Sequence, residues 1–210
     1  RGEIIWPDRQ MMLYAMDVLS RNPSALIIYD IKSTAHLAKL IAENGGQSLM
    51  WKTGHSIMKS KLEETGALLA GEMSGHIFFK ERWYGFDDGL YTAARLLEIV
   101  AKSKKDVSDV FAELPNSINT PELKLSIAED KTFAFIQAFQ AHVDFPDAKL
   151  TKIDGVRAEF SDGWGLVRAS NTSPYLILRF EADNLPALKR IQTLFGNALL
   201  AMDPHLKLPF

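Results

Sequence analysis

The chain has 210 residues, with 24 Lys or Arg against 26 Asp or Glu and a formal net charge of −2. This balance argues against nucleic-acid binding through a basic surface, and the 47% hydrophobic content excludes a mainly disordered chain. The longest apolar run, residues 11–16, is far shorter than the roughly 20 residues of a membrane span, so we expect a soluble protein. The absence of cysteine excludes disulfides and thiolate chemistry, and the cytoplasm is the expected compartment.

The opening segment gives no targeting signal. It starts with Arg1 instead of Met, and residues 1–7 lack both the apolar stretch and the cleavage site of a secretion signal. We expect the chain to begin inside a longer protein.

Helix and strand signals alternate through the first half of the chain. The expected helices are 8–21, 34–43, 56–64 and 88–102, and the expected strands are 24–31, 48–51 and 67–70. An extended excursion is expected at Phe78-Phe79 and Trp83-Tyr84. The run Ala25–Tyr29 is apolar at every position, which is typical of a strand buried on both faces. This pattern predicts an α/β domain with a mostly parallel mixed sheet over residues 1–115.

The pattern changes in the segment 114–121, which contains two prolines and several small polar residues. Beyond it we expect strands at 122–127, 155–160, 165–169 and 175–181, and helices at 131–142 and 185–201. The sequence therefore predicts a smaller α+β domain with an antiparallel sheet over residues 116–210.

Three polar loops follow the three predicted parallel strands, at residues 30–34, 52–55 and 71–76. Ligands of parallel α/β sheets bind beyond the carboxyl ends of the strands, so these loops form the first candidate site. In the third loop, Glu72 and Ser74 stand between Gly71 and Gly75, where their oxygens could bind sugar hydroxyls. The alternative is that both side chains only cap the turn, and that His55 and His76 are structural histidines.

The second candidate site is the segment 168–174 between two predicted strands. Arg168 supplies donors suited to a phosphate, and Ser170, Asn171 and Thr172 could complete an anion-binding nest. A polar hairpin with a surface arginine is the alternative interpretation. Asp87 and Asp88 could act as an acidic pair, but Asp88 is better explained as the cap of the following helix.

The segments 52–55, 71–76 and 168–172, together with 79–89 and 163–165, resemble the signatures of bacterial phosphomannomutases and phosphoglucomutases of the phosphohexomutase superfamily. The resemblance implies that Glu72 and Ser74 bind ring hydroxyls, that Lys32 and His55 line the active site, and that His76 transfers a proton. It implies that Arg168, Ser170, Asn171 and Thr172 bind the phosphate that is not transferred. Met73, Gly75 and Ala169, in the same loops, are included in the expected substrate-binding set.

Two hallmarks of that superfamily are absent from the sequence: the serine that carries the transferable phosphate and the Asp-rich magnesium loop. The resemblance therefore covers only the third and fourth of four domains. It implies a mutase that interconverts hexose 6-phosphate and hexose 1-phosphate through a bisphosphorylated sugar. Magnesium and the missing N-terminal domains would complete the enzyme, and the chain alone, without metal ligands, is expected to be inactive.

Two other functions stay open at this point. A stand-alone module could bind sugar phosphates without chemistry, and a structural domain would bind none. The residues do not distinguish mannose from glucose phosphates, because Glu72 and Ser74 would contact hydroxyls of both sugars.

Overall fold

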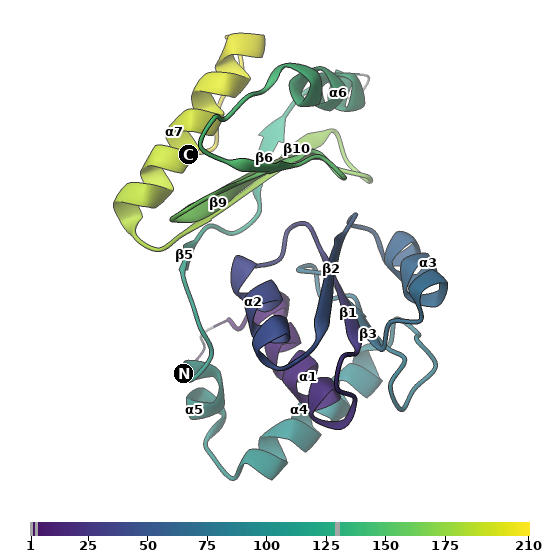
Figure 1. The fold of residues 1–210 in the computed structure, drawn as a ribbon. Coiled ribbons are helices and arrows are strands. Elements are labelled where there is room, and N and C mark those ends of the chain that lie inside the picture. Colours follow the sequence, from purple (N-terminus) through teal and green to yellow (C-terminus); the bar gives the residue numbers. More distant parts are fainter. Residues whose placement is uncertain (1, 3, 129–130) are drawn as a thin grey trace. The chain divides into compact units, whose positions relative to one another are not determined.

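The computed structural model describes residues 2, 4–128 and 131–210, so Arg1 and Glu3 of the opening segment lie outside the described residues. The chain divides into two compact units, Arg1–Asn116 (unit 1) and Ser117–Phe210 (unit 2). Each unit has its own hydrophobic core. Figure 1 shows an α/β arrangement in the first unit and a sheet packed with helices in the second.

The sheet of unit 1 has the strand order β2-β1-β3-β4. Strand β1 (Leu26–Asp30) pairs in parallel with β2 (Gln47–Trp51) and with β3 (Leu69–Gly71). Strand β4 (Ile77–Phe79) runs antiparallel to β3. The predicted mostly parallel mixed sheet is confirmed.

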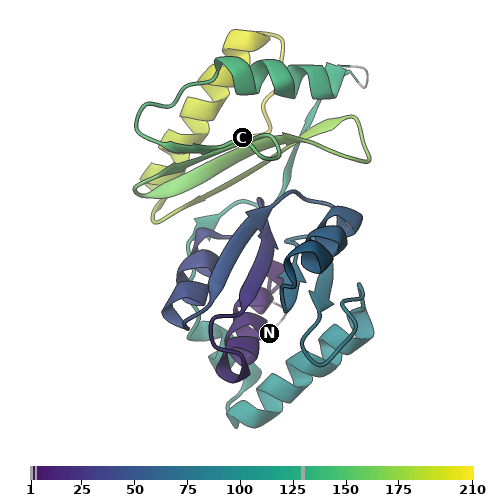
Figure 2. The ribbon, with the colours of Figure 1, turned by 45° about the vertical axis from the view of Figure 1, so that its right-hand side comes forward.

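Helices cover both faces of this sheet (Figure 2). Helices α1 (Pro7–Arg21), α2 (Ala35–Glu43), α4 (Gly89–Ser103) and α5 (Val107–Ala112) contribute to the core on one face, together with Ile27 and Tyr29 of β1. Helix α3 (His55–Thr65) packs on the other face against Ile28. Because successive strand residues point to opposite faces, the apolar run in β1 fills both cores, as the sequence predicts.

Two helices of unit 1 begin with a side-chain cap, and the cap at Asp88 confirms the expectation from the sequence. The Thr34 hydroxyl accepts a hydrogen bond from the backbone of His36 at the start of α2. The Asp88 carboxylate accepts one from Tyr91 N at 2.9 Å and caps α4. Each side chain satisfies one of the backbone N–H groups that the first turn leaves unpaired.

Other features of unit 1 differ from the expectations. Residues Trp83 and Tyr84 lie in a bend and a loop, not in an extended strand, and α5 had no clear signal because it has only six residues. Helix α4 has the expected length, but two of its leucines face outward: Leu90 is 88% exposed and Leu97 69% exposed. Arg95 of the same helix is buried instead.

Unit 2 contains an antiparallel sheet in the order β5-β10-β9-β8-β7, with β6 also paired to β10. Its strands are β5 (Ile118–Asn119), β6 (Leu123–Ser126), β7 (Lys149–Thr151), β8 (Val156–Phe160), β9 (Gly163–Ala169) and β10 (Tyr175–Ala182). Helices α6 (Thr132–His142) and α7 (Leu185–Met202) pack on one face of the sheet. The predicted α+β architecture is confirmed, while the short strands β5 and β7 were not expected.

The other face of this sheet carries three arginines together with Glu159 and Glu181. Leu166 of β9 pairs in register with Arg157 of β8 and with Arg179 of β10. Arg168, two residues along β9, points to the same face as Leu166 because side chains alternate along a strand. The guanidinium of Arg157 lies 3.8 Å from the ring centroid of Trp164 on this face.

Candidate functional site

The three loops of the first candidate site lie at one edge of the unit 1 sheet, because β1, β2 and β3 are parallel and the loops follow their carboxyl ends. Hydrogen bonds connect the loops to one another. The structure thus brings together Lys32 from the first loop, His55 from the second and residues 72–76 from the third.

Asp30 is the residue that joins these loops. Its fully buried carboxylate accepts hydrogen bonds from Ser33 Oγ at 2.7 Å, Thr53 Oγ1 at 3.1 Å and the backbone N–H of Met73 at 3.1 Å. Lys32 Nζ lies 3.7 Å from the same carboxylate. Burial raises the pKa of Asp30, against the lowering effects of Lys32 and of these hydrogen bonds.

Sequence reasoning included Asp30 in a polar loop but not among the site residues. As the last residue of a buried strand it resembles an ordinary strand end. Its three contacts come from residues 3, 23 and 43 positions away, and only the fold reveals them. The available signal was an aspartate that ends a buried parallel strand and is followed by two hydroxyl residues.

Glu72 is held almost completely buried in the third loop, with 1% of its surface exposed. Its Oε2 accepts a hydrogen bond from Gly54 N at 3.1 Å and another from Ser74 Oγ at 3.4 Å. Its Oε1 is buried and has no hydrogen-bond partner among the residues that the structure describes. Burial and the charge of Asp30 raise the pKa of Glu72. Oε1 is therefore an acceptor for which a ligand hydroxyl would supply the donor.

Glycine is required at two points in these loops. Gly54 has a φ of 137° and Gly75 a φ of 101°, values that residues with a side chain rarely adopt. Gly54 directs its N–H to Glu72, and Gly75 closes the turn by donating its N–H to the Glu72 carbonyl at 3.0 Å. Both glycines thus fix the position of the Glu72 side chain.

The two histidines lie side by side, with ring centroids 5.4 Å apart. His76 Nδ1 is 2.7 Å from Oδ2 of Asp87, which lies in the segment between β4 and α4. A carboxylate can only accept, so Nδ1 carries the proton and Nε2 of a neutral ring is an acceptor. The sequence had suggested Asp87 only as a member of an acidic pair with Asp88.

The second candidate site centres on Arg168 in unit 2. Its Nε donates to Asp154 Oδ2 at 3.0 Å, and only 3% of the residue is exposed. Its Nη2 is buried and lacks a hydrogen-bond partner within the described part of the chain. Glycine at position 155 allows this segment to approach strand β9 closely enough for Asp154 to pair with Arg168. A Cβ at position 155 would lie 2.2 Å from Val167 O. A guanidinium held by one edge can bind an anion through its other edge.

The segment after Arg168 is a tight connection between β9 and β10. Ser170 N donates to Tyr175 O at 2.9 Å, and Thr172 N donates to Ser170 Oγ at 3.3 Å. Asn171 and Thr172 are exposed, whereas Ala169 is buried in the core. The structure therefore places Arg168 in strand β9 and Ser170–Thr172 in the loop that follows it, with Ala169 contributing to packing.

Models of known protein families match nearly the whole chain. The sequence model for the phosphoglucomutase/phosphomannomutase alpha/beta/alpha domain III matches residues 6–118, and that for the C-terminal domain matches residues 122–196. The chain belongs to the phosphoglucomutase/phosphomannomutase family. Its two units correspond to these two matched domains.

Relatives in this family are close in sequence and longer. A phosphomannomutase/phosphoglucomutase of Pseudomonas putida is 56% identical over 209 residues, which are 100% of this chain and 45% of the relative. A phosphoglucomutase of Neisseria gonorrhoeae is 55% identical over 99% of this chain and 45% of its own length. The crystal structure of a phosphoglucomutase/phosphomannomutase family protein from Burkholderia thailandensis is 56% identical and superposes with a TM-score of 0.92, covering 100% of this chain and 44% of that one. The chain thus spans less than half the length of these proteins.

The described residues of this family member contain no group of three or more His, Cys, Asp or Glu side chains that could hold a metal ion. The acidic residues of the loops are instead engaged with hydroxyls, backbone N–H groups and a histidine. Among the described helices, none is long and apolar enough to cross a membrane.

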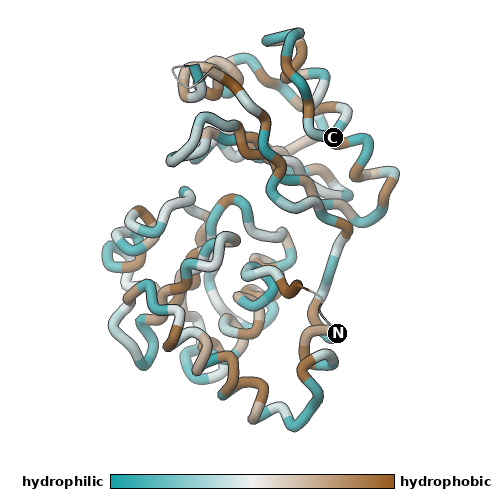
Figure 3. Tube along the Cα trace, turned by 180° about the vertical axis from the view of Figure 1, so that it is seen from behind, coloured by the Kyte–Doolittle hydropathy of each residue, from teal (hydrophilic) through white to brown (hydrophobic). Residues whose placement is uncertain are grey.

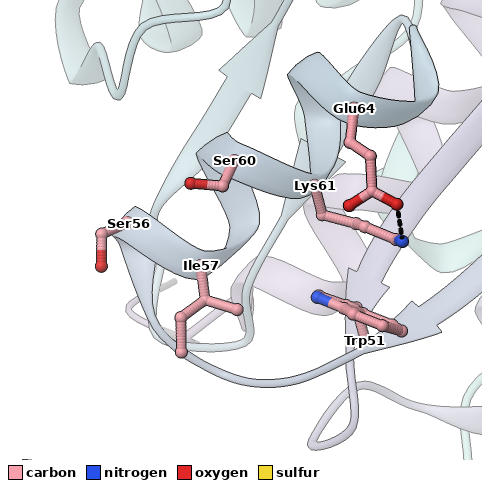
Figure 4. A pocket seen from close by; sticks show the side chains of 6 residues that line it. All are labelled: Trp51, Ser56, Ile57, Ser60, Lys61 and Glu64. Carbon is pink, nitrogen blue, oxygen red and sulfur yellow. Dashed lines mark hydrogen bonds and ion pairs between the residues drawn. The ribbon is translucent and has the colours of Figure 1, made fainter.

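A shallow hollow of about 290 Å³ lies beside α3, and its lining includes none of the predicted site residues (Figure 4). Lys61 Nζ lies 4.2 Å from the ring centroid of Trp51 and 2.6 Å from Glu64 Oε1. Because its ionic groups already pair with each other, this hollow is not part of the site.

Proposed function

We propose that this chain is the sugar-recognition and phosphate-anchoring part of a cytoplasmic phosphohexomutase that interconverts hexose 6-phosphate and hexose 1-phosphate, with mannose or glucose as the sugar. Unit 1 contributes recognition of the sugar hydroxyls, and unit 2 contributes binding of the phosphate that stays in place. The proposal is supported by the family membership and by the geometry of the loops.

The observation that carries the proposal is the unsatisfied Oε1 of Glu72. A buried carboxylate oxygen without a partner is costly, and the surrounding loops hold it in one position through Gly54 and Asp30. A sugar hydroxyl is a neutral donor that satisfies such an oxygen, and Ser74 can contact a neighbouring hydroxyl. A phosphate, by contrast, would be repelled by the Glu72 charge.

In unit 2, Arg168 carries a positive charge, so it would attract the phosphate that Glu72 repels. Asp154 fixes the guanidinium through Nε, which leaves the Nη2 edge for a phosphate oxygen. The hydroxyls of Ser170 and Thr172 and the amide of Asn171 add donors beside this guanidinium.

His76 is the group proposed to move a proton. Asp87 holds Nδ1–H, and Nε2 then accepts the proton of the sugar hydroxyl that attacks phosphorus. Lys32 and His55 line the same loops and contribute charge and contacts. Phosphoryl transfer depends mainly on positioning and charge neutralisation, which these residues supply for the sugar.

The other catalytic parts belong to the remainder of the longer protein. We propose that it supplies the phosphorylated serine and the ligands of a magnesium ion, which neutralises charge on the transferring phosphoryl group. The described residues of this chain form no such metal site, and we expect no turnover from the chain alone.

A titration followed by amide NMR tests this division of roles. With glucose 1-phosphate or mannose 1-phosphate we expect saturable shifts in residues 72–76 and in residues 168–172. With inorganic phosphate alone, only the segment 168–172 should respond. A response of residues 72–76 to inorganic phosphate, or no saturable response to either sugar phosphate, would refute the assignment.

A further inference from the structure

Helix α4 packs Leu96 and Ile99 against the core of unit 1 and buries Arg95, but it also leaves apolar residues on its outer side. Leu90, Ala93, Ala94 and Leu97 are all exposed and recur at the spacing of one helix face. We call these four residues the α4 surface. Figure 3 shows hydrophobic positions recurring along this helix, in the lower part of the view.

Contacts on the buried side of α4 explain why the helix does not rotate about its axis to bury its exposed leucines. Arg95 is 2% exposed, and its Nη2 lies 2.8 Å from Asp17 Oδ2 and 2.8 Å from Glu81 Oε2. Its guanidinium also lies 4.4 Å from the ring centroid of Phe79. Rotating the helix to bury Leu90 and Leu97 would break the ion pairs of the buried Arg95 guanidinium with Asp17 and Glu81, which is strongly unfavourable. The outward leucines are therefore fixed in place by unit 1 itself.

The loop that precedes the helix carries further exposed apolar side chains. Trp83 stacks on Tyr91 of α4 with ring centroids 4.4 Å apart, and Tyr84 and Phe86 are exposed beside it in the chain. Among the described residues of unit 1, eight large hydrophobic side chains are exposed, and five of them fall between residues 83 and 97. Such a concentration is typical of an interaction surface, whereas single exposed leucines are ordinary.

Charges near the α4 surface are already neutralised within unit 1. Glu98 is paired with Arg82 at 3.1 Å and with Lys102 at 2.7 Å. A partner of the α4 surface therefore needs apolar side chains and no compensating charge. Obligate interfaces within one protein have this character.

The geometry points to the part of the protein that precedes residue 1 as the occupant of the α4 surface. The chain amounts to 44–45% of its relatives and matches their domain III and C-terminal domain, so the unmatched length of those relatives lies before it. Helix α1, the first element of unit 1, packs on α4, and Arg9 in its first turn donates to Phe111 O of α5 at 2.7 Å.

This inference rests on the chain being part of a longer protein, as proposed above, and does not depend on the reaction or on the substrate. Its test uses the absence of cysteine from the chain, which makes an introduced thiol a unique probe. Leu97→Cys is a small change at an exposed position. Phe133→Cys on α6 of unit 2, where Phe133 is 59% exposed, is the matched control.

The rate of maleimide modification at each thiol is measured by peptide mass spectrometry in the 210-residue chain and in the longer protein. We expect Leu97→Cys to react at least roughly tenfold more slowly in the longer protein, and Phe133→Cys to react at the same rate in both. Equal rates for Leu97→Cys would overturn the inference. Slow modification in the 210-residue chain that becomes fast on dilution would also overturn it, because a second copy would then be the occupant.

A second variant at the same position introduces a charge, because Leu97→Cys is conservative and could leave an interface undisturbed. Leu97→Glu should leave the thermal unfolding midpoint of the 210-residue chain unchanged, because the position is exposed there. In the longer protein the same change should lower the midpoint by roughly 5 °C or more, since it buries a charge. A shift no larger than that caused by Phe133→Glu in the longer protein would contradict the inference.

Discussion

The imidazole Nδ1 of His76 lies 2.7 Å from the Oδ2 of Asp87, a residue eleven positions further along the chain. The contact connects the third polar loop of unit 1 to the segment that leads into α4. It determines which ring nitrogen carries the proton and therefore which one can accept a proton from a ligand. Asp87 thus has a role that the adjacent Asp88, the cap of α4, cannot replace.

Asp87→Asn should lower kcat of the longer protein by about tenfold or more, because the amide no longer enforces the Nδ1–H tautomer of His76. The ¹⁵N chemical shifts of the His76 ring should change from one tautomer to a mixture. Asp88→Asn is the matched control, since asparagine caps helices as well as aspartate does. Equal kinetics for wild type and Asp87→Asn would remove Asp87 from the mechanism.

Glu72→Ala should weaken sugar-phosphate binding and reduce discrimination among sugars, while binding of inorganic phosphate stays unchanged. Because burial and Asp30 raise the pKa of Glu72, its carboxylate becomes protonated at a higher pH than an exposed glutamate does. On acidification, wild-type affinity for the sugar should therefore begin to fall at a pH above 4.5, the ordinary pKa of a glutamate side chain. Calorimetric titration across pH, with Glu72→Gln as the isosteric control that removes this dependence, is the measurement.

Arg168→Ala should weaken phosphate and sugar-phosphate binding by about ten- to a hundredfold, since a hydrogen bond to a charged group contributes about 1.5–3 kcal/mol. Arg168→Lys should recover only part of the loss, because lysine cannot bind Asp154 and phosphate with a planar fork. Arg190→Ala removes an exposed arginine paired with Asp162 and serves as the control. Unchanged phosphate affinity in Arg168→Ala would show that another group anchors the phosphate.

Asp17, Arg21, Glu81 and Arg95 form an ion-pair cluster in unit 1, and this cluster predicts that the stability of the fold depends on pH. Burial of Asp17 opposes ionisation, but hydrogen bonds from Arg21 and Arg95 outweigh it and lower its pKa from 3.8 to about 2. The lowered pKa stabilises the folded state above the unfolded value, and this contribution is lost as the pH falls through the folded value. Asp17→Asn should therefore lower the free energy of unfolding by about 2 kcal/mol at pH 7.

The difference between wild type and Asp17→Asn should shrink between pH 4 and pH 2, which denaturant unfolding at several pH values can measure. Glu43→Gln, in an exposed pair with Lys39, is the control and should show no comparable effect. A difference that is constant with pH would mean that Asp17 acts through packing instead of charge.

Much of unit 1 could be predicted from the sequence because its strands are continuous apolar runs and its helices are punctuated by caps and glycines. The run Ala25–Tyr29 and the cap at Asp88 are examples that the structure confirms. The parallel order of β1, β2 and β3 then gathers Lys32, His55 and Glu72 at one edge of the sheet. Periodicity and topology were sufficient for this part of the candidate site.

The orientation of α4 could not be predicted in the same way. Periodicity identifies an apolar face, but it does not say whether that face points inward. Here Arg95 faces inward, because Asp17 and Glu81 are brought beside it from other elements of unit 1. The contacts of Asp30 and Asp87 were missed for the same reason, since their partners are distant in sequence.

A coupled assay for conversion of mannose 1-phosphate or glucose 1-phosphate to the 6-phosphate tests the central claim most directly. It is run on the longer protein and on the 210-residue chain, with magnesium and a bisphosphorylated sugar as activator. We predict turnover by the longer protein and none by the chain, which supplies recognition but no phosphoryl donor. Turnover by the pure 210-residue chain, or no conversion of either sugar phosphate by the longer protein, would contradict the account.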